Sequence, residues 1–179
     1  MTNLQVKPAA VDWMAIYVAL CYSIQPIPER MWADTHVALR NLRTIHMGGG
    51  RQNGKTGWAV NMLANEGIII VAKDKLMRQE IEAMYVLKNP KKAIHLTIPA
   101  DCDNPGELVE QLLATHRNSV RRKVFTVMDL QEILKESPNK LKDVSHVIID
   151  DASYNTRTNE VYKVFGDLNM TETMFIALN

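Results

Sequence analysis

The sequence predicts an α/β protein with a mostly parallel central sheet and helices on both faces. Short runs of β-branched and other apolar residues, such as 68–72 and 144–149, have the composition of strands buried on both sides. Segments with helical spacing of apolar residues separate these runs, which favours parallel strands joined by helical crossovers. At 179 residues, with 46% hydrophobic and 23% charged residues, the chain is long enough for one domain with a substantial core.

Proline, glycine and aspartate mark the ends of the elements in the first half of the chain. Pro8 suits the first turn of a helix, and Pro26 and Pro28 end that helix. Gly67 fits a helix C-cap and Asp74 an N-cap. The expected elements are helices 9–22 and 29–40, strand 42–47, helix 56–64, strand 68–72, helix 74–87 and strand 93–98.

The second half continues the alternation of helices and strands. Pro138 ends one short helix, and two adjacent acids end the strand that follows it. The expected elements are helix 105–116, strand 123–127, helix 129–136, strand 144–149, helix 158–168 and strand 174–178. Residues 1–40 are expected to form a helical segment packed on a core of residues 41–179, within a single domain overall.

Charge and cysteine content exclude several classes of protein. A net charge of +1 gives no global basic field that would attract nucleic acid. Cys21 and Cys102 form neither a disulfide framework nor a metal-binding spacing, which suits a reducing cytoplasm. The apolar run 14–21 is too short to span a bilayer, and Asp12 precedes it where a signal peptide would carry positive charge. The sequence therefore predicts a cytoplasmic protein with no membrane partner.

A glycine-rich loop lies between the predicted strand 42–47 and the predicted helix 56–64. From Gly49 to Thr56 it fits G-x-x-x-x-G-K-[ST], the phosphate-binding P-loop or Walker A motif. Lys55 would reach the β- and γ-phosphates of a nucleotide, and the Thr56 hydroxyl would ligate Mg²⁺. An ordinary glycine-rich turn is the alternative. The predicted nucleotide-binding residues are Gly49, Gly50, Arg51, Gln52, Asn53, Gly54, Lys55, Thr56 and Gly57.

Two adjacent carboxylates follow the predicted strand 144–149 in the pattern of a Walker B motif. Asp150 is predicted to hold Mg²⁺ beside the loop hydroxyl, since carboxylates at strand ends are common ligands of this ion. Asp151 is predicted to orient or deprotonate the attacking water. Two acids that merely cap a turn are the alternative for this motif alone. Together the two motifs predict a nucleoside-triphosphate site.

The order of these blocks resembles the first RecA-like domain of superfamily-two helicases and the ATPase domain of viral large terminases. Arg51 to Thr56 is similar to the terminase form R-Q-x-G-K-[ST], and Asp150 to Ser153 stands where helicases have D-E-A-D or D-E-x-H. Segments 69–76 and 125–130 look like motifs Ia and Ib, and 175–179 stands where motif III would begin.

This resemblance implies a RecA-like P-loop NTPase fold with ATP and Mg²⁺ as cofactors. It also implies hydrolysis coupled to work on nucleic acid, most often DNA, with viral DNA packaging in the host cytoplasm as one form. By the same resemblance Arg51 becomes a candidate arginine finger in cis, with a solvated loop cation as the equal alternative.

Departures from the family pattern leave a second function open. The sequence shows no second RecA-like domain and no nuclease domain, so the alternatives are a fragment of a longer motor and a small ATPase that works as a homo-oligomer or with a separate motor or nuclease subunit. Many members carry Glu where Asp151 stands, and the shorter side chain alters the reach to water. A nucleotide-binding interaction module with little turnover is therefore the alternative. A small-molecule kinase is less favoured, because segment 117–123 is short for an arginine-rich lid.

A basic cluster provides the local candidate for nucleic-acid contact. Its members would bind the phosphate backbone, while a solvated charged face is the alternative. The cluster consists of Arg117, Arg121, Arg122 and Lys123.

Overall fold

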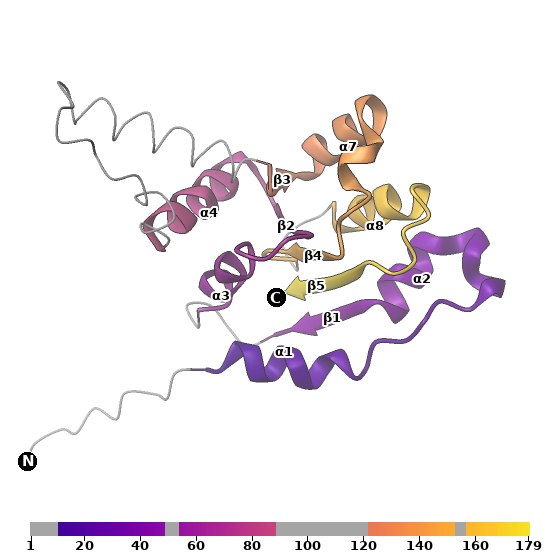
Figure 1. Ribbon diagram of the computed structural model, residues 1–179, viewed down its shortest axis with the longest axis horizontal. Helices are drawn as coiled ribbons and strands as arrows, with labels where there is room; N and C mark the ends of the chain where they lie inside the picture. The colour runs from indigo at the N-terminus through magenta and orange to yellow at the C-terminus, as the bar shows by residue number, and fades with distance from the viewer. Residues whose placement is uncertain (1–10, 49–53, 89–121, 153–156) are drawn as a thin grey trace, which may run out of the picture.

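A single five-stranded sheet forms the centre of the molecule. The computed structural model describes residues 11–48, 54–88, 122–152 and 157–179. Within them the strands lie in the order β1-β5-β4-β2-β3, and every neighbouring pair is parallel, which confirms the predicted α/β class (Figure 1). The strands are β1 (Thr44–Met47), β2 (Ile68–Ala72), β3 (Val124–Thr126), β4 (His146–Ile149) and β5 (Met174–Leu178).

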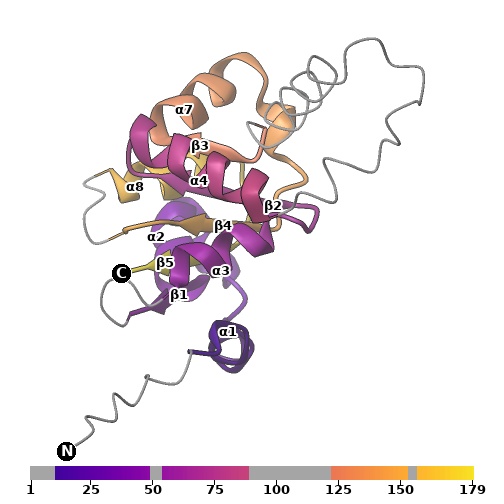
Figure 2. The same ribbon diagram turned by 90° about the vertical axis from the view of Figure 1, so that its left-hand side faces the viewer.

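Helices cover both faces of the sheet in three layers (Figure 2). One buried cluster joins α1, α3 and α4 to one face, and a second joins α2, α7 and α8 to the other. The helices are α1 (Trp13–Cys21), α2 (Thr35–Leu42), α3 (Lys55–Met62), α4 (Lys75–Lys88), α7 (Val127–Glu136) and α8 (Thr158–Asp167), with short 3₁₀ helices η1 (Glu29–Asp34) and η2 (Pro138–Leu141).

The continuous apolar strands are explained by this double coverage. In β2 the side chains of Ile68 and Ile70 enter the cluster with α3 and α4, while Ile69 and Val71 enter the opposite cluster. Every residue of β2 is buried. A strand that alternates between two apolar layers has no solvent face, so it needs no polar residue.

Local hydrogen bonding shifts several element boundaries from the predicted positions. The segment predicted as one helix over 29–40 is a 3₁₀ turn followed by α2, which continues to Leu42 and removes that residue from the predicted strand. Val127 was predicted at a strand end but is the first residue of α7. Thr126 caps that helix, and its side chain and Asp129 form a reciprocal capping box that fixes the start at Val127, before the predicted start at Asp129.

The N-terminal helix also begins later than predicted. Asp12 accepts a hydrogen bond from the Ala15 amide at 3.0 Å, so it acts as the N-cap and α1 starts at Trp13. The predicted strand 93–98 and helix 105–116 lie outside the described residues. The predicted division at residues 40 and 41 falls inside α2, and it stays a prediction.

Candidate functional site

The carboxyl ends of β1 and β4 lie at the same edge of the sheet, with β5 between them. The Asn179 amide donates to the Met47 carbonyl at 3.1 Å, and the Ala152 amide donates to the Leu178 carbonyl at 2.7 Å. The end of β5 therefore joins the backbone after β1 to the backbone after β4. In open parallel sheets this edge, where neighbouring strands leave a crevice, is the usual place for a ligand.

The last residues of the P-loop lead directly into α3. Gly54 has φ +84°, a left-handed conformation that glycine adopts without a steric penalty, and it is the N-cap of the helix. Lys55 follows as the first helical residue and is 9% exposed. Amide groups at a helix N-terminus carry partial positive charge, so this position favours an anion such as phosphate.

Thr56 and Asp150 connect the two predicted motifs. The Thr56 hydroxyl donates to Asp150 Oδ1 at 3.1 Å, although the two residues lie far apart in the sequence. Asp150 is 2% exposed, and its second oxygen, Oδ2, is buried with no hydrogen-bond partner among the residues that the structure describes. Burial raises the pKa of the Asp150 carboxyl above its usual value, while the Thr56 hydrogen bond opposes the rise.

A buried carboxylate oxygen without a partner is costly unless a cation or a donor completes it. The donor set at this point, one hydroxyl and one carboxylate, suits Mg²⁺, which takes oxygen ligands and keeps several waters beside one or two protein groups. No group of three or more His, Cys, Asp or Glu that would form an all-protein metal site occurs among the described residues. Thr56 and Asp150 thus fit a magnesium ion that shares its coordination with phosphate.

Asp151 has an unusual backbone and a basic partner. Its φ of +53° lies in the left-handed region, which few residues other than glycine adopt, and aspartate tolerates it better than most. Its Oδ2 accepts from the Lys73 ammonium at 3.0 Å, and both side chains are about one-third exposed, at 34% for Lys73 and 28% for Asp151. Lys73 follows β2, so the pair adds a third strand end to the same edge.

Several predicted site residues lie outside the described part of the chain. These are Gly49, Gly50, Arg51, Gln52 and Asn53 of the loop, and Arg117 and Arg121 of the basic cluster. Gly57, predicted to contact nucleotide, is described and lies within α3, where its carbonyl accepts from the Lys88 ammonium at 2.8 Å. A Cβ at Gly57 would lie 2.9 Å from Lys88 Nζ, so this glycine also permits the approach of α4.

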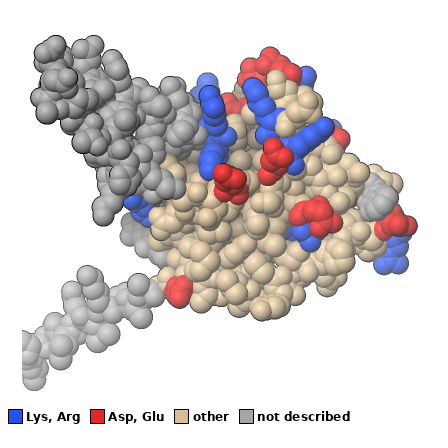
Figure 3. All heavy atoms as spheres, viewed as in Figure 1, with Lys and Arg blue, Asp and Glu red and all other residues tan. Residues whose placement is uncertain are grey.

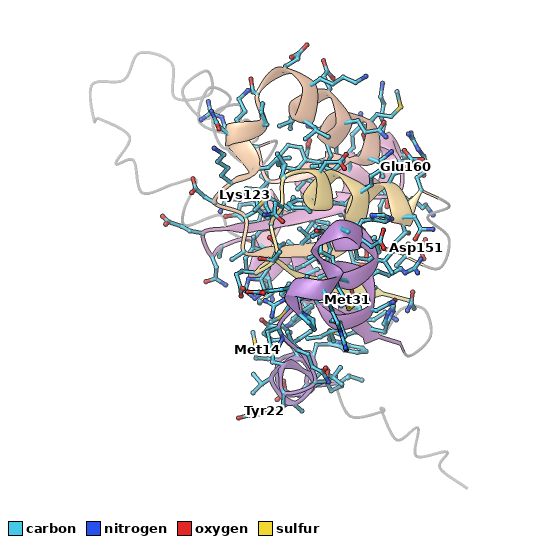
Figure 4. All side chains as sticks on the ribbon, turned by 90° about the vertical axis from the view of Figure 1, so that its right-hand side faces the viewer. Met14, Tyr22, Met31, Lys123, Asp151 and Glu160 are labelled. Atoms are coloured by element: carbon cyan, nitrogen blue, oxygen red, sulfur yellow. The ribbon has the colours of Figure 1, made fainter. Side chains whose placement is uncertain are left out.

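The described part of the basic cluster lies away from the loop. Lys123 directly precedes β3, at the amino edge of the sheet, and Figure 4 shows it on the opposite side of the molecule from Asp151. Its ammonium donates to the Leu63 and Asn65 carbonyls at 2.9 and 3.0 Å, just after α3. This contact gives Lys123 a structural role as a helix C-cap, since lysine there satisfies terminal carbonyls. Arg122 is exposed beside it.

Two side chains near the site were missed by the sequence reasoning. Lys73 carried a usable signal, because it follows a buried strand whose carboxyl end must reach the same edge as Asp150. Trp13 carried none, yet its ring centre lies 5.6 Å from Lys55 Nζ. Only the packing of α1 against α3 brings this tryptophan to the loop.

Surface features elsewhere differ from this site. Figure 3 shows charged side chains concentrated in the upper part of that view, whereas the part over α1 has few. A groove of about 350 Å³ opens at the amino ends of β4 and β5, lined in part by Lys142, Ser145 and Glu172, and it contains none of the predicted site residues. Of the helices that the structure describes, none has the length and hydropathy needed to cross a bilayer.

Comparison with models of known protein families, with curated proteins and with solved structures found no match. Function is therefore inferred from the residues and their geometry.

Proposed function

We propose that this chain is a Mg²⁺-dependent P-loop ATPase with a RecA-like fold. The observation that carries the proposal is the 3.1 Å hydrogen bond from Thr56 Oγ1 to Asp150 Oδ1. It joins the end of the Walker A motif to the end of the Walker B motif, beside a buried carboxylate oxygen that lacks a partner. An ordinary glycine turn and an unrelated acidic turn would have no reason to meet in this way.

Each side chain of the proposed site has a defined part in this function. The N-terminus of α3 and the loop amides bind the phosphates, and Lys55 supplies a positive charge beside them. Thr56 and Asp150 hold Mg²⁺, which when bound offsets negative charge on the phosphate oxygens. Asp151 accepts a proton from the attacking water or orients it. Arg51 is the proposed arginine finger, which would stabilise charge on the transferred phosphoryl group.

The coupling of hydrolysis to nucleic acid is the more distant part of the proposal. It is supported by the resemblance of the motif blocks to helicase and terminase ATPases, with DNA as the expected polymer. A partner subunit or further copies of the chain would supply the second surface that a motor needs.

The primary test is phosphate release by the purified chain with Mg²⁺ and ATP, measured with and without DNA. Lys55→Ala is expected to reduce release to background, because it removes the charge beside the phosphates. Lys142→Ala removes an exposed lysine at the other edge of the sheet and serves as the matched control. Equal turnover by the wild-type and Lys55→Ala proteins would contradict the proposal.

The Lys73–Asp151 ion pair favours a second candidate function. A carboxylate held at 3.0 Å by an ammonium group has less freedom to accept a proton from water. In that case the chain binds ATP and orders a partner surface, with negligible turnover alone.

The second candidate predicts binding without release. ATP and Mg²⁺ at about 100 times the dissociation constant would stabilise the protein by about 2.7 kcal/mol and raise the Tm by several degrees. The Lys55→Ala protein would lack this shift, and phosphate release would stay at background in both. Brisk release by the wild-type chain alone excludes this candidate.

A further inference from the structure

Trp13 lies beside Gly54 and Lys55 of the P-loop, although it is far upstream in the sequence. The Lys55 ammonium nitrogen lies 5.6 Å from the centre of the indole ring, within the range of a cation–π interaction. A Cβ placed on Gly54 would lie 3.9 Å from Trp13 Nε1, so the ring also borders the glycine. Trp13 itself is 7% exposed, which leaves little of the ring to solvent.

Helix α1, which carries Trp13, is held in place by contacts that do not involve the loop. Tyr17, one turn further along α1, packs on Trp58 of α3 with ring centres 5.7 Å apart. Its hydroxyl lies 3.0 Å from His146 Nε2, at the start of β4. Leu20 packs against the same buried cluster. Helix α1 is thus anchored on the sheet and α3, and this anchoring sets the position of its first residue.

An indole ring suits a lysine that must later bind phosphate. A long lysine side chain has many rotamers, and ordering it when the ligand arrives costs conformational entropy. An aromatic face attracts the ammonium group and leaves the charge in place.

We propose that Trp13 is a positioning residue that holds the Lys55 ammonium group, ordered and charged, beside the phosphate position of the loop. The inference rests on the proposed nucleotide site for its purpose, although the contact between ring and ammonium exists without nucleotide. Trp13 acts through Lys55 and does not itself touch the reacting atoms.

Two substitutions separate the ring face from simple packing. Trp13→Phe keeps an aromatic face but loses volume, whereas Trp13→Leu loses both. In calorimetric titrations with Mg²⁺ and a non-hydrolysable ATP analogue, Trp13→Leu is expected to weaken binding about tenfold and Trp13→Phe by less than about threefold. Equal weakening in both variants would show that only packing matters, and unchanged binding in Trp13→Leu would also overturn the inference.

A control on the same face of α1 tests whether docking of the helix accounts for the effect. Leu20→Ala removes part of the packing at the far end of α1 and keeps the indole ring, while Tyr17 still anchors the helix one turn from Trp13. It is expected to lower the Tm and leave analogue binding within about twofold of the wild-type value. Weakening as large as that of Trp13→Leu would contradict a role for the ring.

A readout without nucleotide keeps this inference separate from the proposed function. Acylation of lysine amines in the ligand-free chain, followed by mass spectrometry, measures the accessibility of Lys55 against the exposed Lys142. Trp13→Leu is expected to raise the Lys55 rate severalfold relative to Lys142, and Trp13→Phe to change it little. Equal rates in all three proteins overturn the positioning role. If the acylation rates follow the expected pattern but no protein binds the analogue, the proposed nucleotide function is wrong and the positioning contact still stands.

Discussion

The two ends of the central strands treat their polar groups differently. At the amino ends, both ring nitrogens of His146 have partners, the Tyr17 hydroxyl at 3.0 Å and the Ser145 hydroxyl at 2.9 Å. The buried Thr173 hydroxyl donates to the Val144 carbonyl at 3.0 Å. These hydrogen bonds close within the protein and contribute stability, although Arg43 Nε, just before β1, is buried with no partner among the described residues and Asn169, before β5, has φ +53°.

At the carboxyl ends, hydrogen-bonding capacity and backbone strain remain. Asp150 Oδ2 is buried without a partner, and Asp151 has a left-handed backbone. Such features cost stability and persist at sites that bind ligands. The comparison teaches that the two edges differ in the kind of group left over: the amino edge pairs most of its polar side chains within the protein, and the carboxyl edge leaves a buried carboxylate oxygen available for the proposed ligand.

The sharpest test of this contrast is Asp150→Asn. Loss of the buried charge is expected to reduce Mg²⁺-dependent turnover about 10³-fold or more, which corresponds to an increase of about 4 kcal/mol in the activation free energy. The same change is expected to stabilise the ligand-free protein by about 1 kcal/mol, because a buried unpaired carboxylate is costlier than a neutral amide.

The stability gain should depend on pH. Folding raises the pKa of Asp150, so the native state binds this proton more tightly than the unfolded chain does. The wild-type protein therefore loses stability as the pH rises from the pKa of the unfolded chain through the higher pKa of the native state. Denaturant unfolding from pH 4 to pH 7 measures the difference between the two proteins. A constant difference, or a less stable variant at pH 7, would contradict a strained site.

Two glycines with positive φ offer a matched pair at the two edges. Gly67 has φ +68°, and a Cβ there would lie 2.8 Å from Ser145 Oγ and 2.9 Å from the Asp143 carbonyl. Gly54 has φ +84°, but its nearest neighbour would be 3.9 Å away. Gly67→Ala is expected to cost about 2–4 kcal/mol, and Gly54→Ala about 1 kcal/mol.

The same pair separates stability from binding. Gly54→Ala is expected to lose most of the rise in Tm caused by ATP, because the loop must keep its amides toward phosphate. Gly67→Ala should keep that rise at a temperature where it is folded. The reverse pattern would show that the two edges are not specialised as described.

Removal of the Thr173 hydroxyl tests the closed hydrogen bonds of the amino edge. Thr173→Val leaves the buried Val144 carbonyl without this donor and is expected to cost about 1–2 kcal/mol, or a few degrees in Tm. Turnover per folded molecule should be unchanged. A neutral result in chemical unfolding would mean that water replaces the hydroxyl.

The smallest expected effect is a loss of stability in acid, caused by His146 at the amino edge of the sheet. Burial lowers the pKa of this ring, and nearby Arg43 lowers it further. Burial raises the pKa of the adjacent Tyr17 to about 12, so the phenol stays protonated. Because the folded pKa lies below the usual value of 6.5, the unfolded chain gains the proton first, and stability is lost as pH falls below 6.5.

The slope from this one group cannot exceed about 1.4 kcal/mol per pH unit. Thermal unfolding between pH 7.5 and pH 5 is expected to show a steeper loss for the wild-type protein than for His146→Gln, which keeps polar contacts but does not titrate. Parallel profiles would place the acid sensitivity elsewhere.

Much of the fold could be predicted because its signals are local. The continuous apolar runs of β2 and β4 require burial on both faces, and the acid pair follows β4. The glycine loop follows β1, a shorter strand with one exposed residue. Since carboxyl ends of parallel strands share one edge, the meeting of Thr56 with Asp150 could also be expected.

The remainder depends on contacts between distant segments. The capping box of Thr126 and Asp129 decided that Val127 is helical, against its β-branched preference. Lys123 caps α3 only because β3 brings it beside the Leu63 carbonyl. No local pattern predicts these contacts, because each follows from tertiary packing.

The pairing of β1 has a consequence for the order of folding. Among the described strands β1 pairs only with β5, which lies near the other end of the chain. Such a pairing requires a long loop to close, at a cost in chain entropy, before the stabilising contacts form. Contacts of high sequence separation therefore slow folding. During synthesis on the ribosome, β1 cannot pair until β5 has been made, and its apolar residues Ile45 and Met47 stay exposed until then. Strand β1 is therefore expected to join the sheet only after β5 has formed, and chaperones would have most to protect around β1 until then.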